Sequence, residues 1–146
     1  MLEAPNILEY PYTRSTGPVI GRFMTELRDG PRLLGATLLD GRVAVPPTEY
    51  DPATGAAVDA DAMVEVGPAG VVTTWSWVAT PRPEHPLDHP FAWALVRLDG
   101  ADTAMLHAVD GVAEGDMKTG LRVTARFAEE RVGSIRDLAC FVAEGS

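Results

Sequence analysis

The segment "RPEHPLDHP", residues 82–90, gathers the side chains of this sequence that are best suited to chemistry. His85, Asp88 and His89 supply two imidazoles and one carboxylate, groups that ligate zinc and that act in acid–base catalysis. Its three prolines disfavour a helix, so we expect a loop between two strands. The segment is a chance cluster of polar side chains, a small metal site, or a polar loop that contacts a ligand or partner together with Arg82.

The rest of the sequence contains no recognised catalytic motif. It has no G-x-S-x-G turn, no G-x-x-x-x-G-K-[ST] loop, no H-E-x-x-H pair and no G-x-G-x-x-G turn. The single cysteine, Cys140, lies in the apolar run "LACFVA", which favours a small buried side chain over a nucleophile. One cysteine also excludes an internal disulfide and a multi-cysteine metal site. His107 lies in a β-like run, where we expect a packed histidine. We therefore predict no catalytic residue, no metal ligand and no bound cofactor.

Four aromatic side chains, Trp75, Trp77, Phe91 and Trp93, lie on two neighbouring β-like runs. They could fill a barrel interior, line an acyl or other apolar pocket, or anchor an interface. Strand aromatics also stack on the bases of single-stranded nucleic acids, but such sites need a basic groove. The net charge of -9 repels phosphates over most of the surface, so we predict no nucleic-acid partner. The candidate contacts for a ligand or partner are thus Arg82, His85, His89, Trp75, Trp77 and Trp93.

From residue 67 onward, apolar and polar residues alternate in short runs separated by turn residues. The runs are "GVVTTWSWVAT", "FAWALVRLD", "TAMLHAVD", "LRVTARFAE" and "LACFVAE". A period of two is typical of strands that bury one face, and in the first run it places Val71, Thr73, Trp75 and Trp77 on one face. Five strands in this length indicate a Greek-key barrel of the oligonucleotide/oligosaccharide-binding (OB) type.

A helix and an irregular segment precede these strands. Residues 15–29 carry apolar side chains at helical spacing, with Pro18 in the first turn and Gly30-Pro31 after the last. Two short β-like pieces follow, "RLLGATLL" and "RVAVPP", and then the turn "DPATG", in which Asp51 can accept hydrogen bonds from backbone amides ahead of it. We predict three parts: an N-terminal arm and helix (1–30), a ribbon-like segment (31–66) and the barrel (67–146).

This order of elements resembles the family called domain of unknown function 35 (DUF35), which combines an N-terminal helix, a rubredoxin-like zinc ribbon and an OB barrel. The resemblance spans residues 15–142 and rests on "RSTGPVIGRF", "TLLDG", Pro46-Pro47, "DPATG", "GVVTTWSWV", "FAWALVRLDGADTAMLHAVDG" and "GDMKTGLRVTARF". The family's four zinc cysteines fall here on Thr37, Asp40, Asp51 and Thr54. These side chains make a poor zinc site. The resemblance therefore implies a mainly β fold: a five-stranded OB barrel preceded by a helix and a metal-free zinc-ribbon-like segment.

Members of the family typically accompany thiolase-fold enzymes that act on acyl-CoA thioesters. This chain looks most like the branch that accompanies sterol-carrier-protein-X-type thiolases, including aldolases that cleave steroid side-chain CoA esters. The resemblance implies an accessory subunit in a complex of two such chains with two thiolase-fold catalytic subunits. The catalytic residues would belong to the partner, and the CoA thioester would be the substrate of the complex.

Other functions stay open. The chain could be a free-standing OB module that binds acyl-CoA or another small anion, an enzyme that uses the His85–His89 loop, or a nucleic-acid-binding OB domain, which its charge opposes. The N-terminus lacks a signal-peptide pattern, and no segment approaches the ~18 consecutive apolar residues of a membrane span. We therefore expect a cytoplasmic location and no membrane partner. The arm at residues 1–14 could be the remnant of a linker to a hydratase domain.

Overall fold

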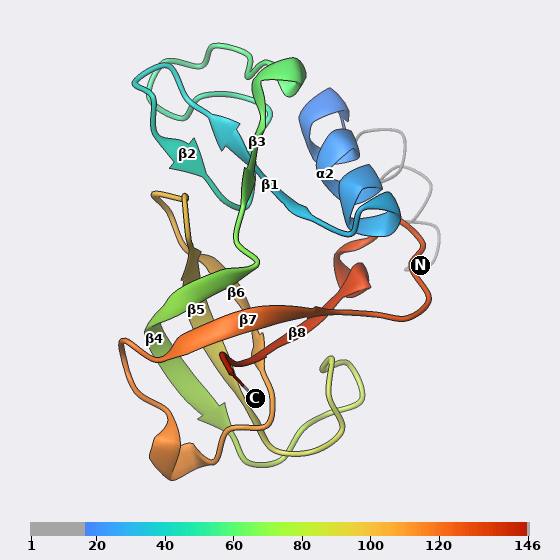
Figure 1. Cartoon of the computed structure of the whole chain (residues 1–146), viewed down its shortest axis with the longest axis vertical. Coiled ribbons are helices and arrows are strands. Elements are labelled where there is room, and N and C mark those ends of the chain that lie inside the picture. Colours follow the sequence, from blue (N-terminus) through green and yellow to red (C-terminus); the bar gives the residue numbers. More distant parts are fainter. Residues whose placement is uncertain (1–16, 146) are drawn as a thin grey trace, which may run out of the picture.

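The computed structural model describes residues 17–145, so the predicted arm at residues 1–14 lies outside it. Figure 1 shows a helix and a small sheet at one end of the long axis and a barrel at the other. Within residues 17–145, no helix combines the length and the apolar character needed to cross a membrane.

The helix α2 (Gly17–Asp29) forms where the apolar spacing predicts it. Val19, Phe23 and Leu27 are buried on one side of it, as the helical period requires. Its first turn is capped from outside: the Glu49 carboxylate accepts the backbone N–H groups of Val19 (3.2 Å) and Ile20 (2.7 Å). These N–H groups have no partner within the helix, so the carboxylate completes its N-terminus.

A three-stranded antiparallel sheet lies beside α2. Its strands are β1 (Leu33–Thr37), β2 (Val43–Ala44) and β3 (Val64–Val66), in the order β2-β1-β3, and the short 3₁₀ helix η2 (Ala60–Ala62) precedes β3. β2 is shorter than the run "RVAVPP" suggests because Pro46 and Pro47 have no N–H to donate. Instead, Val45 exchanges two bonds with the Thr103 hydroxyl: Val45 N–H donates to it (2.7 Å) and it donates to the Val45 carbonyl (2.9 Å).

The barrel confirms the predicted OB fold. Its five strands are β4 (Ala69–Val78), β5 (Phe91–Leu98), β6 (Met105–Val109), β7 (Arg122–Phe127) and β8 (Leu138–Ala143), with the 3₁₀ helices η3 (Glu114–Asp116) and η4 (Ile135–Asp137) in the connections. The strand order is β4-β5-β6-β8-β7, and β4 pairs with β7 to close the ring. Only one residue pair, Val109 and Phe141, joins β6 to β8, so this parallel seam is the weakest join.

The predicted face of the first barrel strand is wrong in part. The β4–β5 register shifts between Val72 and Thr74, which marks a β-bulge at Thr73. Val72 is buried before the bulge, and Trp75 and Trp77 pack against the same core after it. One extra residue thus switches the alternation, and Val71 does not share the face of the two tryptophans.

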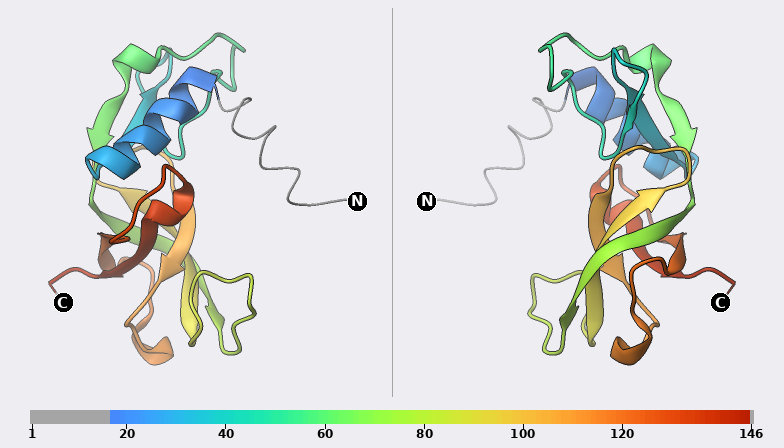
Figure 2. Two further views of the ribbon diagram at one scale, coloured as in Figure 1. Left: turned by 90° about the vertical axis from the view of Figure 1, so that its right-hand side faces the viewer. Right: turned by 90° about the vertical axis from the view of Figure 1, so that its left-hand side faces the viewer.

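One hydrophobic core runs through both parts of the molecule. Its buried members come from α2, from the sheet and from the barrel, including Phe23, Leu33, Val66, Val96 and Phe141. Figure 2 shows the helix and the sheet seated directly on one end of the barrel.

Candidate functional site

A hollow lined mostly by apolar residues opens on the barrel beside the β6–β8 seam. It has a volume of about 550 Å³. Its lining comes from the β4–β5 loop, from β5 and β6, and from η4 and the start of β8: residues 83–87, Trp93, Leu106, His107, Ile135, Arg136, Leu138 and Ala139. The incomplete pairing of β6 with β8 leaves room for this hollow.

His107 lies on the floor of the hollow and bridges the seam. Its Nε2 lies 2.7 Å from the Leu138 carbonyl oxygen, to which the ring donates, and only 8% of the side chain is exposed. Burial lowers the pKa of His107 below its ordinary value of 6.5, although the bond to Leu138 opposes this. The ring is therefore a neutral histidine fixed between two strands, as the sequence suggested, and it also contributes to the hollow.

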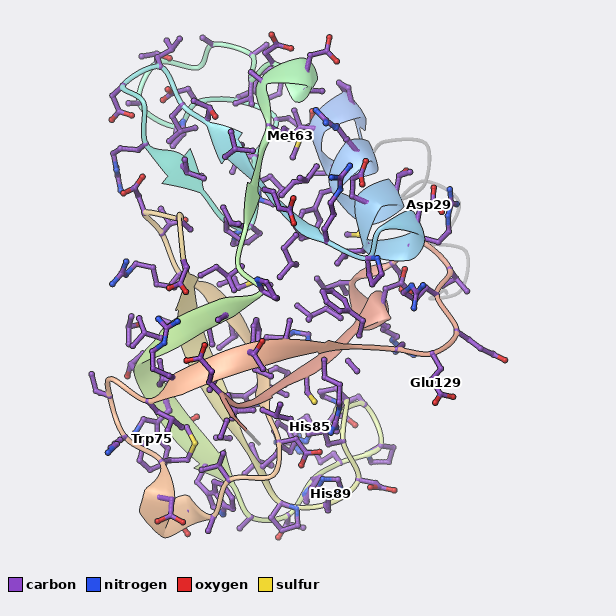
Figure 3. The ribbon with its side chains drawn as sticks, viewed as in Figure 1. Asp29, Met63, Trp75, His85, His89 and Glu129 are labelled. Atoms are coloured by element: carbon purple, nitrogen blue, oxygen red, sulfur yellow. The ribbon has the colours of Figure 1, made fainter. Side chains whose placement is uncertain are left out.

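The β4–β5 loop (residues 79–90) forms one wall. Its tight turn is closed reciprocally: the His85 N–H donates to the Arg82 carbonyl (2.9 Å), and the Arg82 N–H donates to His85 Nδ1 (3.0 Å). The His85 ring packs edge-on against Phe91 and Trp93, with centroid distances of 5.6 and 6.1 Å. Figure 3 shows His85 and His89 on this loop, away from Trp75.

The predicted aromatic cluster separates into two groups. Trp75 and Trp77 pack on the barrel core, whereas Trp93 packs with Phe91 in a second, smaller cluster and lines the hollow. Of the six residues singled out from sequence, only His85 and Trp93 reach the hollow. The Arg82 side chain is mostly exposed and lies 3.9 Å from Glu84, and His89 bonds to Asp88 and Asp110 instead.

A second hollow, of about 270 Å³, adjoins the first and lies beside the middle of α2. It is lined by Ile20, Phe23, Met24, Pro46, Pro47, Met105, Leu106 and Ile135. Leu106 and Ile135 line both hollows, and they are exposed to 59% and 40%. We call the two hollows with this shared ridge the apolar face. An exposed ridge of large aliphatic side chains between two hollows is typical of a contact surface.

Sequence reasoning missed most of this face. Leu106 and Ile135 read as ordinary members of a strand and a loop, and Arg136 carries no motif. A weak signal existed in "GSIRD", where Ser134 and Asp137 form a capping box around an exposed isoleucine. The other residues of the apolar face could not be found from sequence, because the fold brings them together from separate segments of the chain.

The four positions that the resemblance assigns to the family's zinc cysteines are hydrogen-bonded within the ribbon-like segment. Thr37 donates to the Ala62 carbonyl (3.0 Å), Asp40 accepts the Arg42 N–H (3.0 Å) and Thr54 accepts the Ala56 N–H (3.2 Å). Asp51 is buried and accepts two amides, those of Leu39 (3.0 Å) and Ala53 (2.8 Å). These backbone bonds lower the pKa of Asp51 below its ordinary 3.8. Asp51 therefore caps its own turn, as predicted, and its bond to the Leu39 N–H also links this turn to the earlier turn that contains Leu39.

Groups for metal binding or nucleophilic attack do not converge in residues 17–145. No set of three or more His, Cys, Asp or Glu side chains there could hold a metal ion. Cys140 is fully buried, and burial raises the pKa of its thiol. The apolar face thus offers shape and apolar area, and its polar groups are Glu84, His85, His107 and Arg136.

The comparisons with known proteins agree with this architecture. Residues 63–128 match the family model described as "ChsH2, C-terminal OB-fold domain". This match spans the strands β4 to β7, so the barrel of this chain resembles the OB-fold domain of that family. A search of curated proteins found no significant match.

Two solved structures have a similar fold. The chain is 20% identical to one described as "Ltp2-ChsH2(DUF35) aldolase", with a TM-score of 0.59 over 83% of this chain and 91% of that one. It is also 20% identical, again with a TM-score of 0.59, to a DUF35 protein of unknown function from Sulfolobus solfataricus, over 82% of this chain and 85% of that one. At this identity the likeness concerns the fold.

Proposed function

We propose that this protein is an accessory subunit of a thiolase-fold enzyme that acts on acyl-CoA thioesters. The match of residues 63–128 to the ChsH2 OB-fold domain carries the proposal, and the fold shared with a chain of an Ltp2-ChsH2 aldolase supports it. The enzyme would be an aldolase that performs retro-aldol cleavage of a steroid side-chain CoA ester. We further propose a complex of two accessory and two catalytic subunits, located in the cytoplasm.

The apolar face is the surface we assign to the partner subunit. Leu106 and Ile135 expose large aliphatic areas on the strand β6 and on a capped turn. Covering either side chain would contribute roughly 1 kcal/mol or more to association. The adjoining 550 Å³ hollow would then become part of a cavity closed by two subunits, in which the chain helps to shape the substrate site.

Catalytic groups would come from the partner. In residues 17–145 the histidine at the floor of the hollow is neutral and bonded to a carbonyl, and the only thiol is buried. His107 can help to orient a substrate in the hollow, and the bond-breaking step would need groups that the partner supplies.

Affinity capture tests the proposal. The tagged full chain is used to capture proteins from its source organism grown with and without a sterol, and bound proteins are identified by mass spectrometry. We expect a stoichiometric thiolase-fold protein whose aldolase activity on a CoA ester depends on this chain. Capture of no such protein, or activity that is unchanged without this chain, would contradict the proposal.

A matched pair of variants tests the assigned surface. Leu106→Asp places a charge on the ridge and should abolish capture. Leu39→Asp makes the same change at an exposed leucine on the ribbon-like segment, 69% exposed, and should leave capture unchanged. Loss of capture with Leu39→Asp alone would move the interface to the ribbon-like segment.

The alternative is a free-standing module that binds acyl-CoA or another small anion. The hollow favours this alternative because Arg136 and His85 lie among apolar residues, a mixture that suits an anionic group on an apolar chain, whereas the Glu84 carboxylate in the same lining opposes an anion. Calorimetric titration of the isolated chain with CoA and with a long-chain acyl-CoA distinguishes the two functions. Binding of acyl-CoA by a stable monomer that captures no partner would favour the module.

A further inference from the structure

The β4–β5 loop is attached to the barrel by a histidine placed between two carboxylates. His89 Nδ1 lies 3.1 Å from Asp88 Oδ1 in the same loop, and His89 Nε2 lies 2.7 Å from Asp110 Oδ1 just after β6. Residues 83–87 of this loop form a wall of the 550 Å³ hollow. The state of His89 therefore bears on how firmly that wall is held.

Both bonds can exist only with a protonated ring. An ionised carboxylate has no proton to donate, so each ring nitrogen must supply one. A neutral imidazole has a single N–H and would leave a nitrogen lone pair facing a carboxylate oxygen. Removing one proton thus changes one of the two contacts from attractive to repulsive.

The neighbouring charges keep Asp110 ionised. Arg126 of β7 donates to Asp110 Oδ2 (2.9 Å), and the Gly111 N–H donates to Oδ1 (2.8 Å). Burial raises the pKa of Asp110, but the bonds from His89, Arg126 and Gly111 outweigh it and lower that pKa below 3.8. Cys140 of β8 lies near Arg126 and is uncharged, since burial raises the pKa of its thiol. His89 thus faces two carboxylates and one guanidinium, an arrangement that favours its cation.

We propose that protonation of His89 controls the attachment of the β4–β5 loop to the barrel and thereby access to the hollow. The protonated ring holds residues 83–87 in place, and the neutral ring releases them. Hydrogen bonding to Asp110, and then to Asp88, raises the pKa of His89 above its ordinary 6.5. A raised histidine pKa gives an attachment that is complete below pH 6.5 and is lost as pH rises through the folded-state pKa. The role of this attachment in regulating access to a substrate site rests on the proposed function, whereas the pH-dependent attachment of the loop to the barrel does not.

Two measurements on the isolated full chain test the attachment. The titration of the histidine ring protons, followed by NMR, should give His89 a midpoint above 6.5. Amide exchange of residues 80–90, corrected for the intrinsic effect of pH, should be roughly two- to fivefold faster at pH 9 than at pH 6. His89→Gln should show the faster rate at both values. A His89 midpoint at or below 6.5, or equal corrected rates in the unchanged protein, would overturn the proposal.

Variants of the two carboxylates separate the contacts. Asp110→Asn removes the anion that is fixed by Arg126 and should bring the His89 midpoint close to 6.5. Asp88→Asn removes only a fully exposed carboxylate and should lower the midpoint less. Equal shifts of the His89 midpoint in the two variants would contradict the idea that Asp110 is the main group that attaches the loop to the barrel. Because neither partner nor CoA is present, a negative result here leaves the accessory-subunit proposal standing, and failed capture leaves this one standing.

Discussion

At the scale of single residues, Asp51 joins the two turns of the ribbon-like segment. One carboxylate oxygen accepts the Leu39 N–H of the first turn, and the other accepts the Ala53 N–H of its own turn. A zinc ion held by cysteines from both turns would connect them in the same sense. The buried Asp51 carboxylate thus links the two turns, as a metal ion bound by both turns would.

Asp51→Asn should lower the melting temperature by several degrees, because the new amide group must point its N–H at one of the two backbone donors. Asp40→Asn is the matched control, since Asp40 accepts only from its own turn. The lowered pKa of Asp51 gives a stability contribution that is present above pH 3.8 and is lost as pH falls through the folded-state pKa. Thermal unfolding at pH 7 and pH 3 should therefore show a smaller difference between variant and parent at pH 3.

Glu49 caps a helix that lies about 30 positions before it in the chain. Glu49→Ala should reduce the free energy of unfolding by about 1 kcal/mol, the usual cost of losing a capping group. Denaturant titration measures this loss, and Glu130→Ala at an exposed loop position is the control. An equal effect of the two changes would assign Glu49 no special role.

At the scale of elements, the β7–β8 connection is shaped by Asp137, which is 1% exposed. Its carboxylate accepts the N–H groups of Val132 (2.9 Å), Gly133 (2.7 Å) and Ser134 (3.3 Å). This bonding sets the position of η4 and so places Ile135 on the apolar face. The capped turn explains how a loop can present an exposed isoleucine at a defined point.

Asp137→Asn should cost about 2 kcal/mol, because a donor would replace an acceptor in a buried niche of N–H groups. Chemical denaturation measures the loss, with the exposed Asp116→Asn as control. If the variant folds, partner capture should weaken with it, since Ile135 moves with the turn. If the destabilised variant still captures the partner normally, η4 is not part of the interface.

The β-strand pattern could be predicted from sequence because each strand carries a local period of two. Val123, Ala125 and Phe127 face the core as the alternation in "LRVTARFAE" indicates. The prediction failed at Thr73, where a bulge adds one residue without any Gly or Pro to mark it. Asp51 as a turn cap was also predictable, because an aspartate before Pro and Gly bonds amides close to it in sequence.

The hollow could not be predicted in the same way. His107 meets Leu138 across 31 residues, and the loop wall, Trp93 and η4 come from further separate segments. No local period records such contacts, since they arise from strand order and from the incomplete β6–β8 pairing. Resemblance to a family could supply the fold, but not which residues of this chain line its cavity.

For the whole molecule, pH should act through His107 in the direction opposite to that for His89. Burial lowers the pKa of His107, so below pH 6.5 the unfolded chain binds a proton more readily than the folded chain does. Global stability should therefore fall as pH decreases below 6.5. His107→Gln can keep a donor for the Leu138 carbonyl and should flatten this decline, whereas His107→Leu should lose about 1–2 kcal/mol at pH 8. Unfolding free energies measured between pH 5 and 8 test both, and a decline that persists in His107→Gln would assign it to other groups.

The two ends of α2 are completed by residues far along the chain. Glu49 caps its first turn, and Arg131 donates to the Arg28 carbonyl of its last turn across 103 residues (3.0 Å). A ribosome makes β1 and Glu49 soon after the helix, but it makes Arg131 only 103 residues after Arg28. During translation, the helix can therefore pack on β1 early, whereas its last turn lacks the Arg131 donor until the chain beyond β7 has been made, so the end of the helix gains its final contact late in synthesis.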